Sequence, residues 1–72
     1  MKVLDLLCRC YNCDYRRTVV TIRDNNGGRM QTIPDRIPDY VKNFYVRDFK
    51  LGPMKDEHLV ALEIRTEGSD RL

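Results

Sequence analysis

Three cysteines stand within six residues of one another in the stretch CRCYNCDYRR, and they are the residues best suited to bind a metal. Thiolates are good zinc ligands, so Cys8, Cys10 and Cys13 could share one ion with the only histidine, His58, or with Asp14. However, a helix that continues through both Cys8 and Cys10 would direct them about 200° apart, and the chain has no second cysteine pair. We therefore expect no metal and no other cofactor, and reduced thiols that pack as small apolar groups, with Cys8 in the core.

Nucleophilic or metal-assisted catalysis has little support in the sequence. The only serine, Ser69, lies close to the end of the chain, so a Ser-His-acid triad is not expected. Four carboxylates could bind a divalent ion for phosphodiester chemistry, but no calcium-loop or paired acidic motif connects Asp14, Asp24, Asp35 and Asp39. We expect a protein that is not an enzyme, with a small DNA-nicking protein as the enzymatic alternative.

Arginines and tyrosines alternate through the first part of the chain. Residues 1–30 carry six basic and three acidic groups, although the whole chain has a net charge of only +2. Arginines can contact phosphates while aromatic rings stack on bases, as in single-strand binders. This alternative function, the binding of DNA or RNA, would use Arg9, Arg16, Arg17, Arg23, Arg29, Tyr11 and Tyr15. Because acidic residues interrupt the run and the overall charge is low, the sequence by itself favours a solvated charged face.

The length of the chain, 72 residues, allows one domain. A domain of this size buries only about 60% of the surface that its unfolded chain exposes, so its core is small and oligomerisation is a common source of further stability. The sequence shows neither a signal-peptide pattern nor an apolar run of about 20 residues. These features predict a cytoplasmic protein that does not contact a membrane.

The beginning of the chain has the apolar spacing of an amphipathic helix over residues 2–11. The stripe consists of Val3, Leu4, Leu7, Cys8 and Tyr11. The following segment, TVVTIRDNNGGRMQTI, predicts a β-hairpin with strands at about 18–24 and 28–33, because Asn and Gly tolerate the positive φ of tight turns.

The second half of the chain predicts a short helix and a second hairpin. Pro38 can begin a helix that ends near Asn43, and FYVRDFKL and HLVALEIRT then read as strands separated by the loop residues GPMKDE. Residues 67–72 should form a frayed tail. The expected fold class is α+β, with the N-terminal helix on a four-stranded antiparallel sheet made of two hairpins joined by a short helix.

The two C-terminal strands predict a homodimer or higher homo-oligomer. Simple alternation places Tyr45, Phe49 and Leu51 on the face opposite Phe44 and Val46, so both faces of the strand carry large apolar groups. One helix can cover only one face, and a second subunit would cover the other. The predicted interface consists of Tyr45, Phe49, Leu51, Val60, Leu62 and Ile64.

The order of MKVLDLL, TVVTIRDNNGG, IPDYVKNFYVRDFKL and HLVALEIR resembles small proteins encoded by phages and prophages of Gram-positive bacteria. The members of that group that share this pattern are compact, oligomeric and β-rich, and some resemble anti-CRISPR or other counter-defence factors. The resemblance implies no catalytic residue. It implies a non-enzymatic protein that inhibits or sequesters a host defence component by surface contact, which is the function that the sequence favours.

Overall fold

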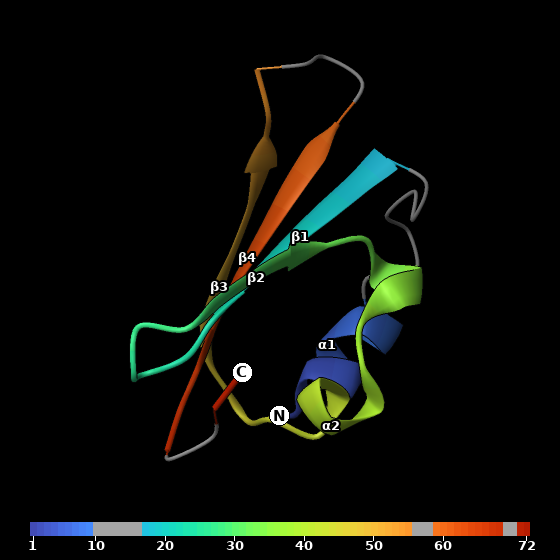
Figure 1. The fold of residues 1–72 in the computed structure, drawn as a ribbon. Helices are drawn as coiled ribbons and strands as arrows, with labels where there is room; N and C mark the ends of the chain where they lie inside the picture. Colours follow the sequence, from blue (N-terminus) through green and yellow to red (C-terminus); the bar gives the residue numbers. More distant parts are fainter. Residues whose placement is uncertain (10–16, 56–58, 69–70) are drawn as a thin grey trace.

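The computed structural model describes residues 1–9, 17–55, 59–68 and 71–72, and within them the chain forms two short α-helices, a 3₁₀ helix and four strands. In chain order the elements are α1 (Val3–Arg9), β1 (Thr18–Arg23), β2 (Arg29–Thr32), η2 (Pro34–Arg36), α2 (Asp39–Lys42), β3 (Val46–Pro53) and β4 (Val60–Thr66). Both α-helices lie on the same side of the sheet, and no helix of the described residues covers its other side (Figure 1). The predicted α+β class, the N-terminal helix and the four-stranded sheet are confirmed.

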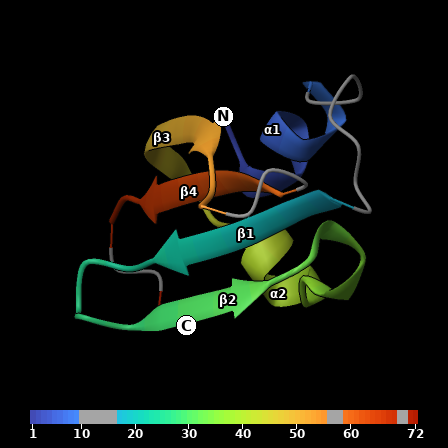
Figure 2. The ribbon, with the colours of Figure 1, turned by 90° about the horizontal axis from the view of Figure 1, so that it is seen from above.

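The sheet is mixed rather than purely antiparallel, which corrects the predicted topology. Its strand order is β2-β1-β4-β3, with antiparallel pairing in both hairpins and parallel pairing between β1 and β4. The segment with η2 and α2 crosses below the sheet from the edge strand β2 to the opposite edge strand β3 (Figures 1 and 2). This crossover brings the second hairpin back with β4 in the centre, where it runs in the same direction as β1.

The hydrophobic core fills the space between the sheet and the helices. Its buried members are Val3, Leu6, Leu7, Val20, Ile22, Ile37, Val41, Phe44, Leu62 and Ile64. In the parallel register Val20 lies beside Leu62 and Ile22 beside Ile64, so the two central strands supply four of these side chains from adjacent positions. The pairing of β1 with β4 therefore builds the centre of the core.

The buried stripe of α1 differs from the predicted one. The helix buries Val3, Leu6 and Leu7, whereas Leu4 is 45% exposed and Cys8 is exposed. The chain has apolar residues on two sides of this short helix, and the positions spaced i, i+3 and i+4 are the ones that face the core. The prediction of a buried Cys8 is therefore wrong.

A β-bulge in β3 changes which side chains share a face. Val46 pairs with Thr66 but Asp48 pairs with Arg65, so Arg47 is an extra residue in the ladder. Beyond it, Phe49 lies opposite the core residue Ile64, on the helix side of the sheet. The prediction of an apolar surface on the uncovered face is therefore wrong, because the bulge moves Phe49 to the same face as Val46.

The predicted interface also needs correction at two of its residues. Leu62 and Ile64 are 1% and 0% exposed, so they belong to the core of a single chain and cannot form an intermolecular contact. Three other residues of the predicted set remain accessible, with Tyr45 50% exposed and Phe49 and Leu51 48% each. Val60 is half-buried.

The turn of the first hairpin holds the end of the chain. Asp24 Oδ1 accepts hydrogen bonds from the N–H groups of Asn26 (2.8 Å) and Gly28 (2.6 Å), and Oδ2 accepts one from Leu72 (2.9 Å). A Cβ atom at position 28 would meet the Asp24 carboxylate, so any larger residue there would displace this side chain from its hydrogen bonds. Leu72 also packs against the core. The prediction of a frayed tail is therefore wrong for Leu72.

We predict that Asp24 stabilises the protein only above acidic pH. The hydrogen bond from Leu72, and those from Gly28 and Asn26, lower the pKa of Asp24 below its ordinary value of 3.8. A lowered pKa means that the stabilisation is complete above this ordinary value and is lost as pH falls through the lower folded-state value. Thermal unfolding should show wild type more stable than Asp24→Asn at pH 7, and this difference in stability should shrink as the pH falls below 3.8. A difference that does not change with pH would contradict this account.

A second prediction concerns the exposed thiol. Cys8→Ser should change the free energy of unfolding by no more than about 0.5 kcal/mol, because exposed substitutions away from specific contacts have small effects. Val3→Ala, on the buried side of the same helix, is the matched comparison and should destabilise the protein by at least about 1 kcal/mol. Equal effects of the two substitutions in urea denaturation would show that the stripe is misassigned.

Candidate functional site

The face of the sheet opposite the helices carries most of its polar side chains. Because Val20, Ile22, Leu62 and Ile64 point into the core, the residues between them point to the other side. The polar residues that the strand registers place on this open face are Thr21, Arg23, Arg29, Gln31, Asp48, Lys50, Glu63 and Arg65. The open face is therefore a charged surface rather than a second apolar one.

Three arginines form a row across neighbouring strands of this face. Arg23 on β1 is the register partner of Arg29 on β2 and of Arg65 on β4, and Arg65 is the partner of Asp48 on β3. Neighbouring strands are only about 4.8 Å apart. We call Arg29, Arg23 and Arg65 the arginine row. The arginine row and Asp48, which lies at its end, together carry three positive charges and one negative charge.

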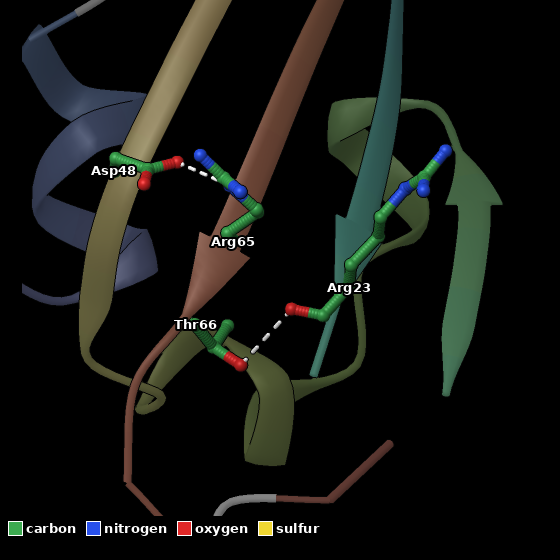
Figure 3. A network of polar contacts seen from close by, with 4 residues as sticks. All are labelled: Arg23, Asp48, Arg65 and Thr66. Carbon is green, nitrogen blue, oxygen red and sulfur yellow. Dashed lines mark hydrogen bonds and ion pairs between the residues drawn. The ribbon is translucent and has the colours of Figure 1, made fainter. Parts of the chain in front are cut away.

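Only one arginine of the row is neutralised within the described residues. Arg65 Nε donates a hydrogen bond to Asp48 Oδ1 at 2.7 Å (Figure 3), which raises the pKa of Arg65 above its ordinary value and keeps the side chain charged. No carboxylate in the described part of the chain forms an ion pair with Arg23 or Arg29, both of which are exposed. Like charges on directly opposite positions repel, so a bound anion would relieve an unfavourable arrangement.

A buried threonine fixes the two central arginines beside each other. The Thr66 hydroxyl, 1% exposed as a residue, donates a hydrogen bond to the carbonyl oxygen of Arg23 at 3.1 Å (Figure 3). This bond connects the end of β4 to the end of β1 directly after Arg65. The backbone positions of Arg23 and Arg65 are therefore held together where the parallel ladder ends.

A shallow depression lies next to the arginine row. It has a volume of about 230 Å³ and is lined by Arg23, Asp48, Lys50, Glu63, Ile64 and Arg65. A second depression of about 180 Å³ shares Lys50 and Glu63 with it and continues towards Gly52. Each is below the roughly 300 Å³ of a typical small-molecule pocket. Their size and open shape suit a phosphate group or another surface contact.

The structure brings together only part of the arginine and tyrosine set predicted from the sequence. Arg23 and Arg29 lie on the open face, whereas Arg9 lies at the end of α1 and Arg17 precedes β1. Three further members, Tyr11, Tyr15 and Arg16, lie outside the described residues.

Most of the predicted zinc ligands also lie outside the described part of the chain. These are Cys10, Cys13, His58 and the alternative fourth ligand Asp14. Cys8 is exposed on α1, and the described residues contain no cluster of three potential metal ligands.

Sequence reasoning missed Arg65 and Lys50. Arg65 is far from the N-terminal basic run, and only the parallel register of β1 with β4 places it beside Arg23. The available signal was the alternation in HLVALEIRT, where Glu63 and Arg65 must face away from the core once Leu62 and Ile64 are buried.

No family model, no curated protein and no solved structure matches the chain. None of the helices in the described ranges has the length and apolar character needed to cross a membrane. The candidate site therefore rests on the geometry of the sheet.

We predict that Thr66→Val weakens the end of the parallel ladder. The substitution keeps the shape of the side chain but removes the hydrogen bond to the Arg23 carbonyl, at an expected cost of roughly 1–3 kcal/mol. Thr32→Val, on the edge strand β2, is the control and should have a smaller effect. Urea denaturation measures both, and the account fails if the two variants are equally stable.

Proposed function

We propose that the protein is a non-catalytic nucleic-acid-binding accessory protein that contacts the phosphate backbone through the open face of its sheet. The observation that carries this proposal is the arginine row, in which Arg29, Arg23 and Arg65 occupy register-matched positions on three neighbouring strands. The sequence predicts nucleic-acid binding as the alternative to inhibition of a host component, and the shared register of the three arginines supports this alternative.

The chemistry of the arginine row suits the phosphate groups of a nucleic acid. A guanidinium group offers planar pairs of N–H donors that bind phosphate oxygens in a bidentate way, and it stays charged at all physiological pH values. Successive phosphates of a nucleic acid can meet successive arginines, and the release of their counterions supplies the binding free energy. The open, shallow form of the neighbouring depressions leaves room for a chain that passes over the surface.

Two other functions remain predictions from the sequence. Inhibition of a host defence component, in the manner of an anti-CRISPR protein, rests on the resemblance to small phage proteins, and the arginine row supports it only if the target surface is acidic. DNA nicking would need a catalytic group. The same binding experiment separates these functions, because an inhibitor of a protein target need not bind a free oligonucleotide.

The test is the salt dependence of oligonucleotide binding, measured by fluorescence anisotropy with labelled single-stranded DNA, duplex DNA and RNA. We expect binding at low salt that weakens as salt increases, with a slope set by the number of phosphates contacted. Arg23→Ala combined with Arg29→Ala should weaken binding to all sequences and reduce the slope by about 2, one for each arginine.

The matched control removes two arginines that are exposed outside the sheet. Arg9→Ala combined with Arg36→Ala makes the same change in net charge but leaves the open face intact. We expect this variant to retain most of the affinity. The proposal is contradicted if wild type shows no salt-dependent binding at low ionic strength, or if both double variants lose affinity equally.

A further inference from the structure

The outer edge of β3 is free over part of its length. At its start the edge is covered by the N-terminal residues, since Val46 donates its N–H to the Met1 carbonyl at 2.8 Å and Val3 donates to the Phe44 carbonyl at 2.9 Å. After Val46, no described residue pairs with this edge, because β3 is the last strand of the sheet. Pro53, which has no N–H, limits the free stretch at the other end.

The backbone groups that point outward from this stretch can be assigned from the ladder. Met54 donates its N–H to the Leu59 carbonyl, so Met54 directs its backbone towards the neighbouring strand segment. The backbone N–H and carbonyl groups alternate in direction along an antiparallel ladder. Those of Gly52 and Lys50 therefore also point to β4, whereas those of Phe49 and Leu51 point outward. The free edge therefore presents N–H and carbonyl groups of Phe49 and Leu51.

The side chains of the same stretch are apolar on one face and charged on the other. Phe49 and Leu51 are 48% exposed on the helix side. Asp48 and Lys50 lie on the open face, two residues apart and of opposite charge. The bond from Arg65 uses Oδ1 of Asp48, and no hydrogen bond from a described residue reaches Oδ2.

We propose that this edge binds the same edge of a second copy of the chain, in antiparallel orientation, with Phe49 opposite Phe49 of the second copy. A two-fold axis then places Asp48 opposite Lys50 of the second copy, and Lys50 opposite its Asp48. These are positions without direct backbone bonds, where facing side chains are closest. The two Phe49 backbones exchange hydrogen bonds, and their rings meet on the helix side as a cross-strand aromatic pair.

Charge selects this register from its neighbours. A shift of two residues in one direction places Lys50 opposite Lys50 of the second copy, and a shift in the other direction places Asp48 opposite Asp48. The bulge and Pro53 are features that discourage general aggregation of an edge strand. They leave the stretch 47–51 for pairing with itself, and the two open faces then form one continuous surface.

The test uses two charge-reversed variants, separately and mixed, with masses measured by light scattering and sedimentation at micromolar concentration. Wild type should have twice the 8.5 kDa mass of one chain. In a dimer of Asp48→Lys, lysines would face each other at both pairs of positions 48 and 50. In a dimer of Lys50→Asp, aspartates would face each other at the same two pairs. Each variant alone should therefore be a monomer. Mixed in equal amounts, they should form a heterodimer, because each lysine then meets an aspartate.

Two controls carry the same charge changes away from β3. Asp35→Lys in η2 and Lys55→Asp after β3 are exposed positions, and both variants should remain dimers. Circular dichroism checks that each protein is folded. Asp48→Lys also removes the hydrogen bond from Arg65 and could fail to fold for that reason. In that case the mass of the folded Lys50→Asp variant alone tests the proposed dimer. A monomeric wild type, a dimeric Lys50→Asp variant, or folded variants that stay monomeric when mixed would each overturn the proposal.

Discussion

The parallel pairing of β1 with β4 is the constraint on which the rest of the structure depends. On one face its register places Val20 beside Leu62 and Ile22 beside Ile64, and these contacts form the centre of the core. On the other face the same register places Arg23 beside Arg65. Burial of apolar area stabilises the register, at about 25 cal/mol for each Å² removed from water. Because alternation couples the two faces, the core fixes the position of the arginines.

The fold tolerates the repulsion within the arginine row because the core residues on the other face fix the register of the strands. Repulsion between facing cations costs only a few tenths of a kcal/mol to about 1 kcal/mol per pair, whereas a one-residue slip would move Ile22 and Val20 into water. Asp48 offsets part of the repulsion, although its pair with Arg65 is exposed to solvent and so contributes little. The proposed binding surface therefore costs the fold little stability.

Local patterns in the sequence predicted the elements better than their arrangement. The hairpin over DNNGG, the short helix after Pro38 and the two C-terminal strands follow from turn chemistry and β-branched residues, and each is present in the structure. The order of strands in the sheet depends on how the crossover packs, and no local pattern specifies this. The open-face arginines could not be grouped before the register was known.

Two predictions are wrong for the same physical reason, because a short segment with apolar residues on several sides has no single apolar stripe. In α1, the apolar residues allow more than one stripe, and packing buries Leu6 in place of Leu4. In β3, an extra residue at Arg47 breaks the alternation. An insertion of this kind has no clear mark in the sequence, so the face of Phe49 could not be predicted by counting.

The most direct test of the central claim is a titration of ¹⁵N-labelled protein with a short oligonucleotide, followed by NMR at the arginine side-chain Nε–H groups and the backbone amides. If the register of β1 with β4 creates the binding surface, the largest shift changes belong to Arg23, Arg29 and Arg65, and the amides of α1 and α2 change little. Changes that are largest in α1 and α2, or an absence of any change at low salt, would contradict the account.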